Sequence, residues 1–148
     1  MKKRTGDPWI PTEKYSHALS GLTVNMLVRD VPAHVEFVRD VLGLQVVYSD
    51  PDIAVYRWGP NEWMVHADHT YEDSDNPMKE VVGPMAARGA GVELRVHGCD
   101  PDLAEAAARE RGIEVLAPSA DKPHGLRETY IRDTDGYVWV PDVPVDPL

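Results

Sequence analysis

Two groups of residues combine side chains that could carry out chemistry. His66, Asp68 and His69 bring imidazole and carboxylate groups into one short run, and such groups are ligands for divalent metal ions. Glu128 and Tyr130 stand two positions apart, so on a strand they share a face. A carboxylate in an apolar cleft has a raised pKa and can act as a base beside a phenol that acts as an acid. The candidate catalytic residues are therefore Glu128, Tyr130 and His66.

Each group also has a plainer interpretation. On a strand, His66 and Asp68 share a face whereas His69 points away or lies in the loop, so we interpret the group as ligand-contacting or structural rather than as a metal site. Hydrogen bonds that hold a hairpin together account equally well for Glu128 and Tyr130. Both interpretations of that pair remain open.

The elements that position these residues begin with a β-hairpin at Gly125–Val140. Two runs rich in β-branched and aromatic residues flank Asp133-Thr134-Asp135-Gly136, where an Asp-Gly pair allows a backbone with positive φ. Alternating apolar residues predict a strand at Leu22–Val28 and a second one at Val92–Val96. Further strands are predicted around Gln45–Tyr48, Ile53–Trp58 and Glu62–Asp68, and from Ile113.

A helix follows each of the two alternating strands. Asp30 is expected to cap the first helix, which ends at Gly43, and Asp100-Pro101 opens the second, with Leu103 and Ala107 on its inner side and Gly112 as its end. When the two halves of the sequence are aligned with Val24 on Val92, Gly43 and Gly112 fall within one residue of each other. Both halves thus follow the order strand, helix, three strands, and a repeated unit buries its open face against its copy.

The repeat predicts the fold class α+β, with two paired βαβββ modules forming a curved mixed sheet around a concave cleft and with the helices outside. Val24, Met26, Val28, Val92, Leu94 and Val96 should lie under the helices, so the opposite parity faces the cleft. Glu93 and Arg95 are then neighbours on one face and can pair. The expected ligand-binding residues are Asn25, Leu27, Met64, His66, Asp68, Glu93, Arg95, Glu128, Tyr130, Val138 and Val140, provided that no β-bulge inverts a strand.

Composition limits the partners and the compartment. The formal net charge of −10 argues against nucleic acid, which is bound by clustered Lys and Arg. No apolar run is long enough for a membrane span, and Gly6-Asp7-Pro8 stands where a signal peptide would be apolar, so we expect a cytoplasmic protein. The lone Cys99 is interpreted as structural.

The chain is expected to contain one main domain, at 22–143. Residues 1–21 are polar and contain Pro8 and Pro11, so they should form an arm that Trp9 and Ile10 anchor. Within the domain we place module 1 at about 22–70, a linker at about 71–90 and module 2 at about 91–143. Residues 144–148 form a tail.

The hairpin resembles a known family. Gly125-Leu-Arg-Glu128, followed by Arg132-Asp-x-Asp-Gly-Tyr137, is similar to the last hairpin of the vicinal oxygen chelate superfamily, which includes glyoxalase I, extradiol dioxygenases and bleomycin-resistance proteins. Thr134 stands where members usually carry Pro. The resemblance covers roughly Leu22 to Val143 and implies the same paired-module fold.

Metal-using members of that superfamily bind a divalent ion through His or Glu on the first and last strand of each module. Carried onto this chain, the resemblance places those positions at Thr23, Met64, Gly91 and Val140, none of which offers a carboxylate or imidazole. It therefore implies no metal site and no cofactor.

The function implied is a metal-free protein of the bleomycin-resistance kind that binds a small organic molecule in the cleft, and by resemblance a homodimer. One alternative is a metal-dependent lyase or dioxygenase of the glyoxalase kind with ligands relocated to His66, Asp68 and Glu128, or metal-free acid–base chemistry. Another is a non-catalytic structural module whose cleft is filled by side chains or by the arm. The fold alone does not decide among them.

Overall fold

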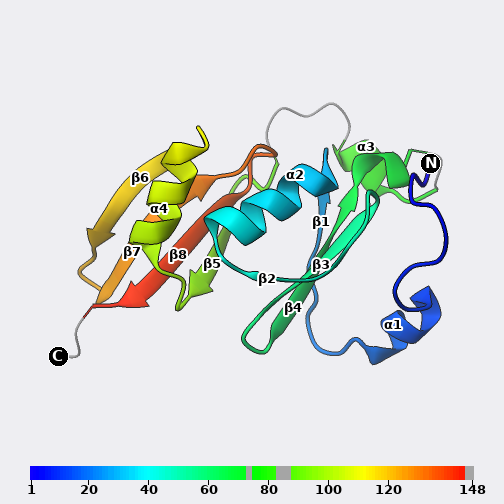
Figure 1. The fold of residues 1–148 in the computed structure, drawn as a ribbon, viewed down its shortest axis with the longest axis horizontal. Coiled ribbons are helices and arrows are strands. Elements are labelled where there is room, and N and C mark those ends of the chain that lie inside the picture. The colour runs from blue at the N-terminus through cyan, green and yellow to red at the C-terminus, as the bar shows by residue number, and fades with distance from the viewer. Residues whose placement is uncertain (73–74, 83–87, 146–148) are drawn as a thin grey trace. The chain divides into compact units, whose positions relative to one another are not determined.

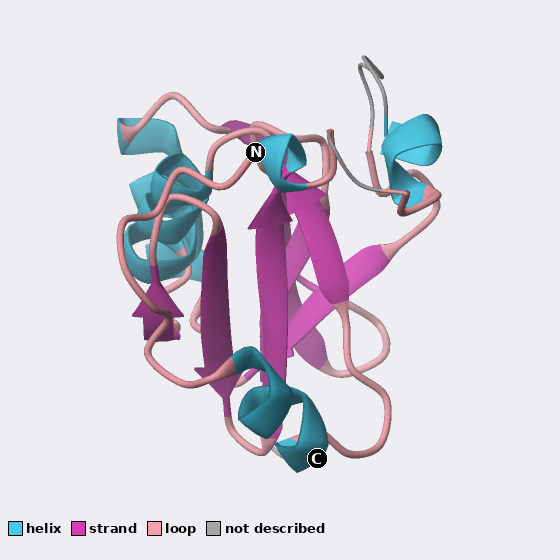
Figure 2. Ribbon diagram, turned by 90° about the vertical axis from the view of Figure 1, so that its right-hand side faces the viewer, coloured by secondary structure: helices cyan, strands magenta, loops and turns pink. Residues whose placement is uncertain are grey.

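The chain contains two four-stranded mixed sheets, each joined to short helices (Figure 1). The structure is a computed structural model and describes residues 1–72, 75–82 and 88–145. Figure 2 distinguishes helices from strands by colour. The strands are β1 (Asn25–Val28), β2 (Gln45–Ser49), β3 (Ile53–Trp58), β4 (Asn61–Ala67), β5 (Glu93–His97), β6 (Glu114–Asp121), β7 (Leu126–Arg132) and β8 (Val138–Pro144). The helices are α1 (Thr12–Ala18), α2 (Val31–Glu36) with its π-helical continuation η1 (Phe37–Val41), the 3-10 turn η2 (Asp68–Thr70), α3 (Met78–Val82) and α4 (Pro101–Glu110).

The two sheets repeat one topology. Their strand orders are β1-β4-β3-β2 and β5-β8-β7-β6, and in each the first strand runs parallel to the last while the other pairs are antiparallel. Asn25 pairs with Met64 at the start of β1, as Glu93 pairs with Val138 at the start of β5. The α+β class and the strand-helix-three-strand repeat are confirmed.

The chain divides into two compact units. Unit 1 comprises residues 1–35 and 45–83, and unit 2 comprises residues 36–44 and 84–148. The predicted linker at 71–90 and tail at 144–148 lie in part outside the described residues. None of the described helices has the length and apolarity needed to cross a lipid bilayer.

The predicted hairpin forms between β7 and β8, and its turn explains the Asp-x-Asp-Gly-Tyr run. Asp133 is buried, and its Oδ1 accepts hydrogen bonds from the backbone amides of Asp135, Gly136 and Tyr137 at 2.9–3.0 Å. Its Oδ2 accepts one from the indole nitrogen of Trp139 at 2.9 Å. Gly136 has φ of 106°, so a residue without Cβ is favoured there.

The helices begin where the sequence places their caps. Asp30 accepts a hydrogen bond from the amide of Ala33 at 2.9 Å, and Asp100 accepts from the amides of Asp102 and Leu103. The predicted inner face of α4 is wrong, however, because Leu103 is 70% exposed. Pro101, Ala104 and Ala108 face β6, β7 and β8 instead. Because the alanine side chains are small, the helix can approach the sheet closely.

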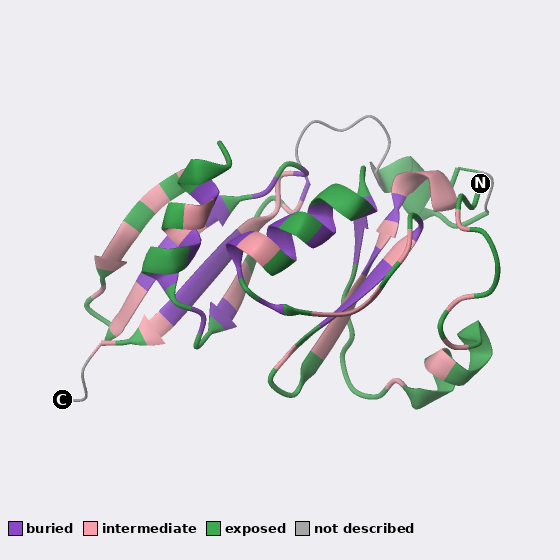
Figure 3. Cartoon of the chain, viewed as in Figure 1, coloured by how far each residue is buried: buried purple, intermediate pink, exposed green. Residues whose placement is uncertain are grey.

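The two first strands are shorter than predicted. Leu22, Val24 and Val92 precede β1 and β5 and are exposed, so the expectation that Val24 and Val92 lie under the helices is wrong. Met26, Val28 and Val96 are buried as predicted, and Leu94 is half-buried. Figure 3 shows how the buried residues gather along the strands and on one side of α2, η1 and α4.

Two segments expected to be irregular contain helices. The arm forms α1, and α3 lies within the stretch at about 71–90, for which the sequence predicts a linker. His34 is 3% exposed, and its Nδ1 lies 2.9 Å from the Tyr56 hydroxyl. Cys99 is buried, which agrees with its interpretation as a structural residue. Burial raises its pKa to about 11, and its Sγ donates to the Leu42 carbonyl.

The strands that carry the candidate residues keep an unbroken register. Register shifts occur only in the pairings of β2 and β6 among the described strands. In β6 they fall between Val115 and Ala117 and between Ala117 and Ala120, around Pro118. β6 is an edge strand, where a proline is tolerated. The predicted parity of β1, β4, β5, β7 and β8 therefore holds.

Candidate functional site

The sheet of unit 2 gathers six predicted site residues on one face. Glu93 pairs with Val138 and Arg95 with Val140, while Glu128 pairs with Asp142 of β8. Since paired residues of neighbouring strands point to the same side, the alternation along each strand places Tyr130 on this face too. This set comprises Glu93, Arg95, Glu128, Tyr130, Val138 and Val140.

An ionic network centred on Arg95 occupies this face. The Arg95 guanidinium donates to Glu128, to Glu93 at 3.1 Å and to Asp142 at 3.3 Å. His97 Nδ1 lies 2.8 Å from the second oxygen of Asp142. Glu128 and Asp142 are 2% and 1% exposed, so their charges depend on Arg95 for compensation. The expected pairing of Glu93 with Arg95 is confirmed.

Glu128 and Tyr130 do not have the pKa shifts of an acid–base pair. Burial would raise the pKa of Glu128, but hydrogen bonds from Arg95, His124 and Tyr130 outweigh it and hold that pKa below its usual range. Burial raises the pKa of Tyr130, and its hydroxyl donates to Glu128 at 3.1 Å. A base with a lowered pKa and an acid with a raised one are both weakened at neutral pH. The contacts favour the structural interpretation of the pair.

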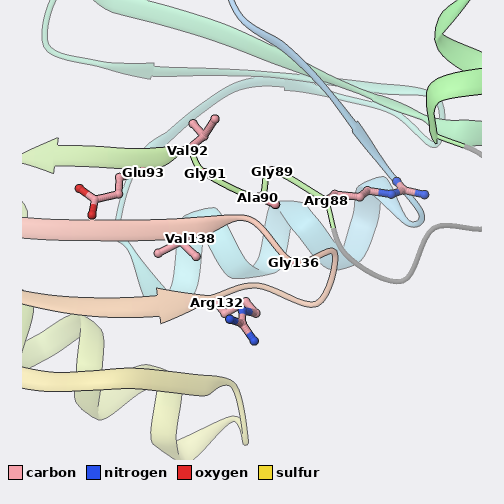
Figure 4. Close-up of a pocket in the computed structure, with 9 residues that line it drawn as sticks. All are labelled: Arg88, Gly89, Ala90, Gly91, Val92, Glu93, Arg132, Gly136 and Val138. Atoms are coloured by element: carbon pink, nitrogen blue, oxygen red, sulfur yellow. The ribbon is translucent and has the colours of Figure 1, made fainter.

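A pocket of about 760 Å³ lies at the end of this face where β5 begins (Figure 4). Glu93 and Val138 line it from the sheet, and Arg132 lines it from the end of β7. The segment from Arg88 to Val92 and Gly136 of the hairpin turn complete its wall. Two of the predicted ligand-binding residues thus line a pocket of unit 2.

The pocket wall is held in place by close packing. Gly89 lies against the ring of Tyr137, and Arg88 lies 3.6 Å from the Asp135 carboxylate, with both side chains buried. This ion pair neutralises the charge of Arg88. Arg132 pairs with Glu114 at 3.3 Å, but both side chains are about half exposed, and exposed pairs of this kind contribute little. The Arg132 guanidinium is therefore the cation best able to contact a ligand.

The sheet of unit 1 gathers a second set of predicted residues. Asn25 pairs with Met64 and Leu27 with His66, so the four share a face. His66 Nδ1 lies 2.7 Å from Asn25 Oδ1, and Asn25 Nδ2 donates to the Tyr71 hydroxyl at 3.0 Å. Burial lowers the pKa of His66, which favours a neutral ring.

The run His66, Asp68 and His69 is not one cluster. β4 ends at Ala67, so Asp68 lies in the η2 turn and not on the strand beside His66, contrary to the predicted bounds. His69 Nε2 lies 2.8 Å from Asp52, whereas His66 bonds to Asn25. The 3-10 turn separates side chains that a longer strand would have aligned.

The N-terminal arm lies on this face of unit 1 and encloses a second, smaller pocket of about 140 Å³. The arm contributes Trp9 and Tyr15, and the sheet contributes Ile53, Val55 and His66. The expectation that Trp9 and Ile10 anchor the arm agrees with their places in this pocket lining. Leu27 and Val140 are buried, so neither lines an accessible surface.

The positions at which the family resemblance would place metal ligands do not fit a metal ion. Thr23 and Gly91 are exposed and Val140 is buried, while Met64 is half-buried on β4. None of them offers the imidazole or carboxylate that a divalent ion needs. Among residues 1–72, 75–82 and 88–145, no group of three or more His, Cys, Asp or Glu is arranged to hold a metal ion.

Sequence reasoning missed three members of the unit 2 site. Asp142 continues the alternation of Val138 and Val140 along the strand, and this pattern is the sequence signal that identifies it. The side chain of His97 is exposed, and it contacts Asp142 through its Nδ1. Arg132 follows from the same alternation along β7, because it pairs with Val138.

Comparison with known proteins supports the fold. A family model described as "Glyoxalase/Bleomycin resistance protein/Dioxygenase superfamily" matches residues 17–140. A glyoxalase-related enzyme from Fulvimarina pelagi has 19% identity and a TM-score of 0.65 over 84% of this chain and 87% of that one. A glyoxalase/bleomycin resistance protein/dioxygenase from Nocardioides has 21% identity and a TM-score of 0.58 over 92% and 93%.

TioX from Micromonospora sp. ML1 has 20% identity and a TM-score of 0.59, covering 87% of this chain and 99% of its own. At such identities the similarity concerns the fold alone. No curated protein matches the sequence. Because the family model covers most of the chain, the protein belongs to the glyoxalase/bleomycin resistance protein/dioxygenase superfamily.

Proposed function

We propose that the protein binds a small organic molecule in the pocket of unit 2 without the help of a metal ion. The observation that carries this proposal is the pocket itself: its volume of about 760 Å³ falls within the range of about 300–1,000 Å³ typical of small-molecule sites. Its lining combines apolar Val92 and Val138 with a few polar groups. The positions that correspond to the family's metal ligands carry no metal-binding side chains, which supports binding without a metal ion.

The charges of the site define the kind of ligand. The carboxylates on this face would by themselves favour a cationic compound, but Glu128 and Asp142 bind the Arg95 guanidinium and are 2% and 1% exposed, so they present little charge to a ligand. At the pocket, Glu93 and Arg132 contribute one charge of each sign. A neutral polar or zwitterionic molecule matches this lining better than a cation does.

The test is a thermal-shift screen of neutral, zwitterionic and cationic compounds, with affinities then measured by calorimetry. A ligand that binds only the folded state adds about 2.7 kcal/mol at a hundredfold excess over Kd. We expect Arg132→Gln and Glu93→Gln to weaken binding. The matched control is Arg109→Gln, since Arg109 is exposed on α4 and pairs with Glu105 away from the pocket.

A second measurement addresses the metal. Elemental analysis after growth in metal-supplemented medium should give well below one equivalent of Zn, Fe, Mn or Ni, and ligand affinity should be unchanged by a chelator. If affinity is lost with the chelator and His66→Ala removes a bound metal, relocated ligands would replace this proposal. If no compound binds, or if Arg132→Gln and Glu93→Gln bind like the parent protein, the pocket is not the site.

A further inference from the structure

The smaller pocket of unit 1 is built from two segments that are far apart in the sequence. The arm contributes one wall through Pro8, Trp9, Ile10 and Tyr15. The opposite wall belongs to the face of β2, β3 and β4, with Tyr48, Ile53, Val55 and His66. Rings and aliphatic side chains thus make up most of both walls, which is the lining expected of a site that takes an apolar group.

Directional contacts fix the arm on this face. Trp9 stacks on Tyr48 with ring centroids 5.5 Å apart and an angle of 14° between the planes. The Tyr15 hydroxyl donates to Glu62 at 3.0 Å. Asp52, itself 2% exposed, accepts hydrogen bonds from two backbone amides of the arm, at 2.7 and 3.1 Å. The arm is therefore a structural wall of the pocket.

The size of the pocket suits a single ring. A cavity of about 150 Å³ in another protein takes up benzene, and the volume here is about 140 Å³. Trp9, Tyr15 and Tyr48 offer faces and edges for aromatic packing, which adds to the gain from burial. Arg4 of the lining pairs with Asp50 at 3.9 Å, and the basic Lys2 shares the lining with the carboxylate of Asp52, so neither sign of charge is favoured in a ligand.

His66 supplies a polar group that can orient such a ring. Asn25 presents its amide nitrogen to Tyr71 and its oxygen to His66, so Nδ1 of the imidazole carries the hydrogen. Nε2 is then the acceptor of the ring. Burial lowers the pKa of His66 and so keeps the ring in this neutral form. A hydroxyl group on the ligand is the matching donor.

We propose that this pocket is a second ligand site, separate from that of unit 2, and that it binds a single uncharged aromatic ring whose hydroxyl group donates a hydrogen bond to His66. The site depends on the arm for its aromatic wall. Its ligand contacts Trp9 and the apolar side chains of β3. It uses none of the residues that line the pocket of unit 2, so the two proposals succeed or fail separately.

The test uses phenol, anisole and cyclohexanol as probes of the full-length protein, followed by NMR of the indole N–H groups. Trp9→Phe identifies the Trp9 signal. Phenol should shift that signal in a saturable way. Anisole lacks the hydroxyl donor and cyclohexanol lacks the aromatic ring, so each should bind about threefold to tenfold more weakly, the loss expected for one neutral hydrogen bond or one aromatic contact.

Variants then separate the pocket from the rest of the protein. His66→Leu should remove the preference for phenol over anisole. Ile53→Phe fills the pocket from β3 and should abolish phenol binding while Trp9 stays on Tyr48, which the ring-current shift of the indole signal reports. Trp58→Phe and Arg132→Gln are controls and should bind phenol like the parent.

Three results would overturn the proposal. Equal affinity for phenol and anisole in the parent protein would exclude the hydrogen bond to His66. Phenol binding that survives both Trp9→Ala and Ile53→Phe would place the probe elsewhere. Absence of any shift in the parent would show that the pocket takes no such ring.

Discussion

Gly89 lies so close to Tyr137 that a Cβ atom at this position would stand 2.4 Å from Cδ1 of the ring. Gly89 also has φ of +65°, a conformation that residues with a side chain rarely adopt. The stretch before β5 is thus held to the hairpin turn by a contact that only glycine permits.

Gly89→Ala should destabilise the protein by about 2–4 kcal/mol, because steric overlap with the ring adds to the backbone strain. Gly91→Ala is the matched control: Gly91 has φ of +80°, but a Cβ atom added there would meet no atom within 4 Å, so only the strain applies. Chemical denaturation of both variants measures the difference. Equal losses of stability would mean that Tyr137 moves aside at little cost.

Val96→Asp tests the parity of β5. Val96 is 5% exposed, so an aspartate there is buried without a partner and should cost about 3 kcal/mol or more. Val92→Asp is the control, since Val92 is 52% exposed and the same change should cost about 0.5 kcal/mol at most. A Val96→Asp variant that melts within a degree or two of the parent would contradict this placement.

Asp133→Ala removes an acceptor for three backbone amides and for the Trp139 indole. Because those donors would remain in a largely buried turn, we expect a loss of about 3 kcal/mol in the free energy of unfolding. Thr134→Ala, at the exposed neighbouring position, should cost far less. Thermal unfolding followed by tryptophan fluorescence measures the stability of both variants. If the two variants have similar melting temperatures, water takes the place of the Asp133 carboxylate as the acceptor.

Glu128→Gln should destabilise the protein by about 3 kcal/mol at pH 7, since it leaves the Arg95 network short of one buried negative charge. The folded-state pKa of Glu128 is lowered from 4.5. Its contribution is therefore complete above that value and is lost as the pH falls through the folded-state pKa. The difference between parent and variant should shrink below about pH 4.5.

Unfolding by urea across pH 3–8 measures this dependence. Glu110→Gln is the control, because Glu110 is 82% exposed and its contact with Arg111 is long, so little effect is expected at any pH. A difference for Glu128→Gln that stays constant down to pH 3 would show that charge is not the cause.

The sequence predicts the repeat and the hairpin because both depend on local patterns. Asp133 and Gly136 define a turn by their own chemistry, and alternation along β5 and β8 survives because no bulge interrupts them. The predicted face of unit 2 follows directly. Asp142 belongs to the same face, because it continues the alternation of Val138 and Val140 along β8.

What the sequence does not reveal depends on contacts between distant segments. The polar helix α1 shows no apolar periodicity, so its position beside the sheet of unit 1 follows only from particular contacts such as the hydrogen bond from Tyr15 to Glu62. The compensation of Glu128 by Arg95 likewise requires the pairing of β7 with β8 and of β8 with β5. Composition gives the carboxylates but not their partners.

The irregular course of β6 also affects how molecules of this protein meet one another. An edge strand offers a row of backbone donors and acceptors that can recruit a strand from another molecule, which is how fibrillar aggregates grow. Pro118 removes a donor from that row, and the register shifts on either side of it break the regular spacing. This border of the sheet is therefore a poor template for aggregation, even though the strand forming it spans eight residues.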